Sequence, residues 1–195
     1  MNTLLQHWSV VVGLALTAVS IIMNGYLVRT KEKRKIELEL AIEKIERELS
    51  EGRYHQRLSE LKANNADLFF LIIKAFNFNS TVIHSMNNVT RNLLSALIDK
   101  YIALHYKVPP QSFTDEWQSK FKQILESQAI LEDYRKTTND LMEQHVAKEQ
   151  KLFDQKEQYR LEKAKIESSI DSIRYWAITL QIIALLFVAW KDLWT

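Results

Sequence analysis

The chain has 195 residues, a net charge of +2, no cysteine, three glycines and two prolines. The lack of cysteine excludes a disulfide framework, thiol catalysis and thiolate metal sites. So little glycine and proline argues against β-sandwiches, barrels and glycine-loop nucleotide sites, because each of those needs turns. The near-neutral charge gives no signal for nucleic acid, and duplex DNA is not an expected partner. We therefore expect an all-α protein.

Charged residues are confined to the middle of the chain. All but one of the 26 basic and all but one of the 24 acidic residues lie between Arg29 and Arg174. The stretches Leu4–Val28 and Tyr175–Trp190 contain none. This distribution predicts two terminal transmembrane helices, residues 4–28 and 175–190, bracketing a helical and coiled-coil domain over residues 29–174.

The first apolar segment, of 25 residues, would be about 37 Å long as a helix, enough for a hydrocarbon core of about 30 Å. Trp8 and Tyr26 lie near its ends, as in an aromatic belt. The alternative is a cleaved signal peptide. A retained anchor is favoured, because no basic residue precedes the segment and a basic cluster follows it, comprising Arg29, Lys31, Lys33, Arg34 and Lys35.

The second apolar segment has 16 residues, about 24 Å as a helix, and could be a buried core helix instead. Aromatic residues bracket it, namely Tyr175, Trp176, Trp190 and Trp194. It is also apolar around nearly its whole circumference, unlike an amphipathic surface helix. We expect it to span the membrane.

Basic residues set the expected orientation. Beside the cluster after the first segment, Arg160, Lys163, Lys165 and Arg174 precede the second. The positive-inside rule then predicts both termini outside and the central domain in the cytoplasm, with the bacterial inner membrane as the favoured location.

Small or polar residues follow one face of the first segment at spacings of three or four: Ser9, Gly13, Thr17, Ser20 and Asn24. The second segment has a weaker counterpart in Ala177, Gln181, Ala184 and Val188. Helix–helix packing is the favoured interpretation, since small residues let backbones approach closely. The alternative is a pore lining, and a ring of copies could combine the two.

The central domain begins as a continuation of the first helix, with heptad spacing of Leu38, Ile42, Ile45 and Leu49 over 29–51. Gly52 is expected to mark a kink or short turn. The apolar block Leu68–Ile73 is expected in a bundle core. A break near 77–81, with Ser80 or Thr81 as N-cap, precedes a second helix that runs to about Lys107.

Pro109 and Pro110 end that helix, and Ser112 or Thr114 can cap the next one. No glycine or proline follows, so a single long helix is expected to reach the end of the chain. We expect it to bend near residues 135–150, so that its second half packs beside residues 29–51. The resulting picture is a two-helix stalk capped by a small helical bundle.

Signals for chemistry are few. The histidines are scattered, and no metal-binding spacing, P-loop or nucleophile elbow occurs. Carboxylates alternate with Lys and Arg as on a solvated helix face. We expect no catalytic residue, no cofactor and no metal.

The pair Arg91-Asn92 resembles the start of the ribonuclease motif of HEPN domains. That motif needs a histidine after four to six intervening residues, where this chain has Ala96, Leu97 and Ile98. His84 lies two turns earlier, in inverted order. The resemblance implies a degenerate, non-catalytic head that contacts RNA, and a membrane-tethered nuclease is the weaker alternative.

With this helical head between two terminal spans, the layout resembles the accessory membrane proteins of type VI-B CRISPR loci. That resemblance implies an oligomeric pore in the inner membrane that strengthens phage defence. Polysaccharide-chain co-polymerases are similar in layout, but their domain is extracytoplasmic, and the Lys/Arg distribution here predicts the opposite.

Three functions follow from the sequence. The first is an oligomeric pore or channel-type effector with a cytoplasmic sensing domain. The second is a membrane-anchored coiled-coil scaffold that positions a partner protein, and the third is the nuclease. The expected partners are the lipid bilayer, further copies of the chain, and a cytoplasmic protein or RNA–protein complex.

Overall fold

The computed structural model describes residues 2–76, 81–123 and 127–193. Within these ranges, the side chains of residues 2–6, 69–70, 72–76, 81–86 and 191–193 lie outside the description. Every regular element in the described ranges is a helix, and none is a strand. The expected all-α class is therefore confirmed.

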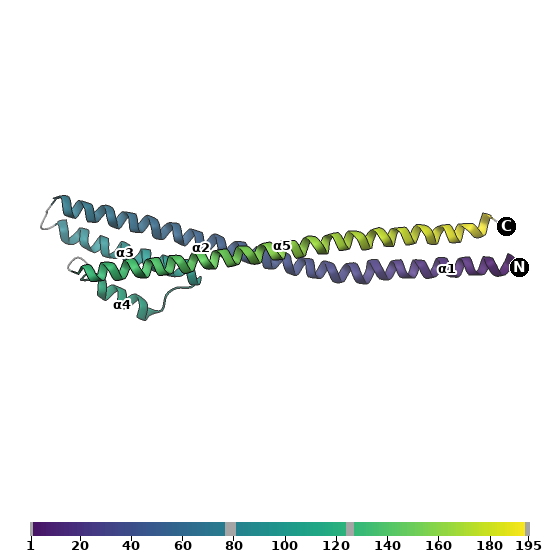
Figure 1. Ribbon diagram of the computed structural model, residues 1–195, viewed down its shortest axis with the longest axis horizontal. Helices are drawn as coiled ribbons and strands as arrows, with labels where there is room; N and C mark the ends of the chain where they lie inside the picture. The colour runs from purple at the N-terminus through teal and green to yellow at the C-terminus, as the bar shows by residue number, and fades with distance from the viewer. Residues whose placement is uncertain (1, 77–80, 124–126, 194–195) are drawn as a thin grey trace. The chain divides into compact units, whose positions relative to one another are not determined.

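The helices in chain order are α1 (Asn2–Ile22), the π-helix η1 (Met23–Val28), α2 (Arg29–Phe76), α3 (Thr81–His105), α4 (Gln111–Phe121) and α5 (Gln128–Leu193) (Figure 1). Ile22 and Arg29, which flank η1, both have right-handed helical dihedral angles. The first three elements are therefore one uninterrupted helix. The predicted continuation of the first apolar segment into the charged region agrees with this.

The chain forms two compact units. The hairpin unit comprises Met1–Glu43 and Lys156–Thr195, and the head unit comprises Lys44–Gln155. Residues 29–43 and 156–174 therefore group with the apolar segments rather than with the rest of the predicted central domain. The assignment of residues 4–28 and 175–190 as membrane spans stays a prediction.

In the hairpin unit, the N-terminal helix lies beside the second half of α5 and runs antiparallel to it (Figure 1). Beyond the apolar segments, Leu38 and Ile170 are buried between the two helices. Ion pairs such as Lys35–Glu167 and Lys163–Glu39 also join these helices. This pairing agrees with the stalk that the heptad spacing predicts.

The core of the head unit is built from α2, α3, α4 and the first half of α5. Its buried residues are Ala66, Val89, Leu93, Leu97, Trp117, Phe121 and Tyr134. The rings of Trp117 and Phe121 on α4 lie 6.2 and 5.6 Å from that of Tyr134 on α5. Burial raises the pKa of Tyr134 to about 12. Aromatic packing thus holds α4 against α5.

The expected turn at Gly52 is wrong, because Gly52 lies inside α2. A Cβ at this position would lie 3.0 Å from His145 Cε1 and 3.3 Å from the ring of Tyr106. The glycine therefore permits close packing of two rings on the helix and does not end it.

The expected burial of the block Leu68–Ile73 is wrong for the two side chains that are described there. Leu68 is 58% exposed and Leu71 is 63% exposed. The described buried positions of α2 in the head unit are Ile45, Leu49, Gly52, Ser59 and Ala66, and all of these except Leu49 recur every seven residues. From Gly52 onward small residues thus form the inner face, and Leu68 and Leu71 lie at other angles around the helix.

The expected helix caps after Pro110 are also wrong. Pro110 itself is the N-cap of α4, so neither Ser112 nor Thr114 has that role. The fixed φ of proline, −63° here, suits the start of a helix without a side-chain hydrogen bond.

The single long helix to the end of the chain is wrong as well. α4 ends at Phe121 and α5 begins at Gln128, whereas α5 is unbroken over the predicted bend at 135–150. The ion pair Lys120–Asp133, at 2.8 Å, joins α4 to α5. Ser127, directly before α5, is a favoured N-cap residue and could have indicated the break.

The bounds of α3 agree closely with the prediction. It begins at Thr81, and Ser80, the other predicted cap, lies outside the described residues. It ends at His105 because Tyr106 has a φ of 53°, in the left-handed region. Such a residue commonly follows a helix C-terminus, although glycine usually occupies the position.

Candidate functional site at the contact of the apolar helices

The stripe of small residues on α1 meets α5 at Gly13. Gly13 is buried, and a Cβ added to it would lie 2.9 Å from Val188 Cγ2 and 3.1 Å from the backbone oxygen of Ala184. Only a residue without a side chain allows the two backbones to approach this closely. Gly13 is therefore a packing residue within the hairpin.

Ser20 makes the second close contact, two turns further along. It is fully buried, and its hydroxyl donates a hydrogen bond of 2.8 Å to the backbone oxygen of Ala177. Ala177 and Ala184 are 0% and 2% exposed. Two small residues seven apart on one helix thus face two alanines seven apart on the other.

Thr17 and Asn24 of the predicted stripe do not take part in this contact to the same degree. Thr17 is half-buried, and its hydroxyl bonds to Gly13 O of its own helix at 2.9 Å. Ser9 is half-buried, whereas Asn24 and Gln181 are exposed. The structure therefore brings Gly13 and Ser20 against α5 and leaves two polar side chains on the outside of the hairpin.

Asn24 lies in the π-helix η1, directly before Gly25. Single π-helical turns within α-helices are rare and often occur at functional sites. A Cβ at Gly25 would meet no atom within 4 Å, so no close packing requires this glycine. Gly13 and Gly25 thus differ in role although they lie on one continuous helix.

Large apolar side chains cover the outside of the paired segments. Those more than half exposed are Trp8, Val11, Leu14, Ile21, Ile22, Tyr26, Tyr175, Trp176, Ile178, Ile182, Leu185, Leu186 and Trp190. The aromatic residues lie near the segment ends, as the sequence predicts. Two helices of the described chain are long and apolar enough to cross a membrane by length and composition.

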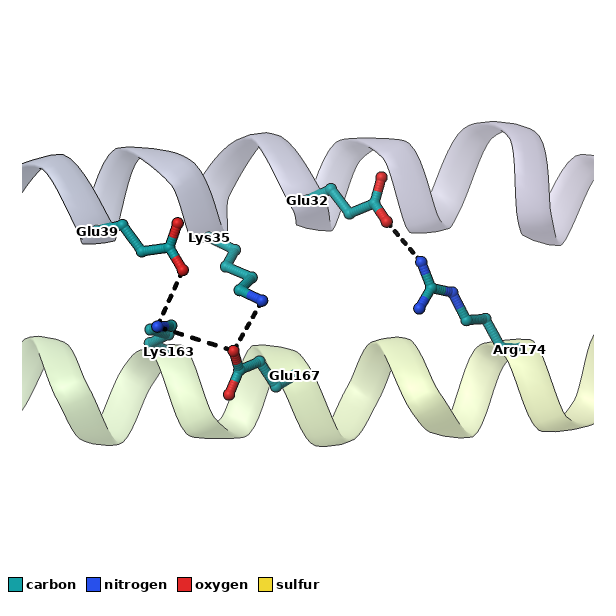
Figure 2. A network of polar contacts seen from close by, with 6 residues as sticks. All are labelled: Glu32, Lys35, Glu39, Lys163, Glu167 and Arg174. Carbon is teal, nitrogen blue, oxygen red and sulfur yellow. Dashed lines mark hydrogen bonds and ion pairs between the residues drawn. The ribbon is translucent and has the colours of Figure 1, made fainter.

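Ion pairs continue the pairing where the apolar segments end (Figure 2). Arg174 and Glu32 are joined at 2.6 Å, and Lys35 and Glu167 at 2.8 Å. The hydrogen bond from Lys35 lowers the pKa of Glu167. A groove of about 310 Å³ lies between these pairs, and Ile170 and Asp171 complete its lining. Because both cations of the groove are already paired with carboxylates, it has no free positive charge for an anion.

The head unit holds a polar cluster that sequence reasoning missed, between α2 and α3. Asp99 is 6% exposed and pairs with His55 at 3.2 Å and with Lys62. Lys62 also donates to Ser95 Oγ at 2.7 Å. These bonds compensate the burial of the Asp99 carboxylate. Asp99 and Lys62 lie on the inner faces of their helices. Charged residues at such inward-facing positions were the sequence signal that could have indicated this cluster.

A second cluster surrounds Gly52. His145 is 5% exposed, and its Nδ1 has no hydrogen-bond partner within the described chain. Lys148 donates to Leu104 O at 2.6 Å and lies 3.7 Å from the ring centroid of Tyr106. Burial lowers the pKa of both His145 and Lys148. These groups are enclosed by the helices, as expected for packing rather than for contact with a substrate.

The residues of the degenerate HEPN motif lie on α3. Arg91 is exposed and Asn92 is half-buried, while the side chain of His84 lies outside the described residues. The described side chains hold no group of three His, Asp or Glu that could bind a metal ion. The contact of Gly13 and Ser20 with α5 is therefore the candidate site whose geometry the structure defines in most detail.

Comparison with models of known families, with curated proteins and with solved structures finds no match.

Proposed function

We propose that this protein is a non-enzymatic membrane-anchored scaffold, in which a two-helix hairpin in the bilayer holds a helical head at the membrane surface to position a partner. One observation carries the proposal. Along the apolar segments of the hairpin unit the closest contacts are made by Gly13, Ser20, Ala177 and Ala184, and most large apolar side chains point outward.

This distribution suits lipid and not water. In water, burying a Leu, Ile or Phe side chain contributes about 1.5–3 kcal/mol, so a soluble helix pair would turn these side chains inward. In lipid that driving force between helices is absent, and close contact through small residues stabilises the pair instead. The exposed aromatic residues near the segment ends fit the two headgroup levels.

The packing geometry favours a scaffold over a pore. Gly13 and Ser20, two central members of the proposed pore lining, are occupied by contacts with α5. In the head unit, Asp99 and Lys62 pair with each other between helices, and His145 is buried. The proposed orientation stays the predicted one, with both termini outside and the head in the cytoplasm.

Further copies of the chain are the proposed first partner. On α2 of the head unit, Tyr54, Leu61 and Leu68 recur every seven residues and are 60%, 59% and 58% exposed. An exposed apolar heptad stripe is typical of coiled-coil pairing between identical helices. We expect it to contact a second copy.

A pore is the second candidate function. Asn24 and Gln181 are exposed polar residues in otherwise apolar surroundings, and polar side chains within spans commonly face a partner or water. A ring of copies could turn them toward a lumen. The antiphage role and the RNA contact that the sequence resemblances imply stay predictions.

The testing experiment combines membrane extraction, particle mass and ion flux. A scaffold should resist an alkaline wash of membranes, form a small oligomer in nanodiscs and give no flux in liposomes. Release by the wash would refute the anchor.

A pore should form a ring of about six or more copies and conduct ions. Asn24→Leu with Gln181→Leu should then abolish flux and keep the particle mass. Reporter domains fused to each terminus would test the orientation, and activity only of reporters that work in the cytoplasm would contradict it.

A further inference from the structure

Four of the five basic residues that follow the first apolar segment form two groups in the structure, and the fifth, Lys31, is half-buried and belongs to neither. Arg34 and Lys35 pair with Glu162 at 3.0 Å and Glu167 at 2.8 Å, both on α5. Figure 2 shows Lys35 and Glu167 turned toward each other between the two helices. These two cations join the two helices of the stalk, and their charge is already compensated.

Arg29 and Lys33 form the other group. Both are exposed, and neither makes an ion pair within the described residues. Glu32, the acidic residue between them in sequence, is engaged by Arg174 at 2.6 Å. The four-residue spacing places Arg29 and Lys33 on the same side of α2, where their charges add.

Exposed aromatic rings lie at the same level of the hairpin. Tyr26 is 70% exposed and precedes Arg29 by three residues. On α5, Tyr175 is 67% and Trp176 is 56% exposed, and they lie between the contacts Arg174–Glu32 and Ala177–Ser20. Tyr and Trp side chains prefer the headgroup level of a bilayer. The two uncompensated cations therefore lie where lipid phosphates would be.

We propose that Arg29 and Lys33, beside Tyr26, bind the phosphodiester groups of anionic phospholipids in the leaflet that faces the head. The inference rests on the proposed membrane anchor. A basic residue near an anionic surface strengthens binding about fivefold, and the guanidinium of Arg29 can also contact phosphate oxygens in a bidentate way. Arg34 and Lys35 lack this role because carboxylates of α5 already hold them.

The structure provides a matched pair of variants for the test. Arg29→Gln with Lys33→Gln removes the two free cations, whereas Arg34→Gln with Lys35→Gln removes two cations only one turn away. The full chain is placed in nanodiscs of phosphatidylcholine with a minor share of phosphatidylglycerol. Mass spectrometry of the released complex then measures the enrichment of phosphatidylglycerol on the protein.

We expect phosphatidylglycerol to be enriched to a similar degree on the parent protein and on the Arg34/Lys35 variant. On the Arg29/Lys33 variant its enrichment should fall by more than about tenfold. Equal losses in both variants would reduce the effect to net charge and overturn the assignment. So would the absence of enrichment in the parent.

Two further arms separate the possible causes of failure. Inorganic phosphate is added to the detergent-solubilised protein with its bound phosphatidylglycerol. If phosphate displaces the lipid, the site prefers the free ion, and the assignment to phospholipid is wrong. Flotation with vesicles after an alkaline wash tests the anchor itself. A protein that floats without lipid preference refutes only this inference, whereas a protein that stays behind refutes the anchor as well.

Discussion

The two units of this chain use opposite residues at their helix contacts. Along the apolar segments of the hairpin unit the closest helix contacts are made by Gly13, Ser20, Ala177 and Ala184, and most Leu, Ile and Trp side chains face outward. In the head unit the helices meet through Trp117, Phe121, Leu97 and Val89. Both units are antiparallel helix pairs or bundles, so the helical architecture alone does not explain the difference.

The proposed membrane anchor accounts for this difference, because the surroundings of a helix pair select its contact residues. Where water surrounds the helices, burial of large apolar side chains is the main stabilising term. Where lipid surrounds them, that term vanishes and close backbone approach becomes decisive. A series of substitutions can test whether the two units really follow these different rules.

The largest effect is expected from Phe121→Ala in the head core. Phe121 is 1% exposed, and loss of a buried aromatic ring costs about 3–5 kcal/mol. Thermal unfolding of the detergent-solubilised protein, followed by near-ultraviolet circular dichroism, measures the loss. Val108→Ala is the control, since Val108 is 77% exposed and should change stability by less than about 0.5 kcal/mol. Equal losses would mean that the head core is misassigned.

Gly13→Ala should destabilise the hairpin by about 1–3 kcal/mol, because the added methyl group overpacks the contact with Val188 and Ala184. Gly25→Ala is the matched control on the same helix and should not destabilise, since its Cβ would meet nothing. Unfolding in dodecyl sulfate, followed by tryptophan fluorescence, measures both. A Gly13→Ala protein as stable as its parent would contradict the close contact.

Leu61→Glu with Leu68→Glu should lower the mass of the nanodisc-embedded particle, because charged residues cannot pack in an apolar coiled-coil seam. Val146→Glu on α5, which changes another exposed apolar residue of the head, is the control. Light scattering gives the masses. If the control reduces the mass as much as the stripe variant does, the second copy does not bind at this stripe.

A modest pH effect is expected in the head alone. Burial lowers the pKa of His145 most, Glu149 and a backbone hydrogen bond with Ala103 raise it by less, and Lys148 and Arg53 lower it further. Because the folded pKa lies below the unfolded value of 6.5, the contribution to stability is complete above that value. It is lost as the pH falls through the folded pKa. The unfolding midpoint of the head should therefore fall between pH 7 and about pH 5, and His145→Gln should reduce this slope.

The smallest effect is expected from Glu167→Gln in the stalk. Its partner Lys35 is on an open surface, and exposed ion pairs contribute little and are screened by salt. The unfolding midpoint should fall slightly at low salt and match the parent at high salt. A difference that persists at high salt would show that this pair does more than hold the stalk.

The sequence alone determined the helical class, the two apolar segments and the pairing of their charged continuations. These follow from composition and from local periodicity, which need no knowledge of neighbours in space. It also identified Gly13 and Ser20 as contact candidates, because residues at this spacing share one helix face.

Only the tertiary structure decided what lies opposite each face. The sequence predicts a kink or short turn at Gly52 because it does not show that His145 and Tyr106 pack on this residue. The break before Gln128 has no glycine or proline, and it follows from the packing of α4 on Tyr134. The same holds for Arg29 and Arg34, which are equivalent in sequence until Glu162 of α5 pairs with one of them. Contacts between residues far apart in the chain depend on the whole fold, whereas helix formation depends mainly on neighbours along it.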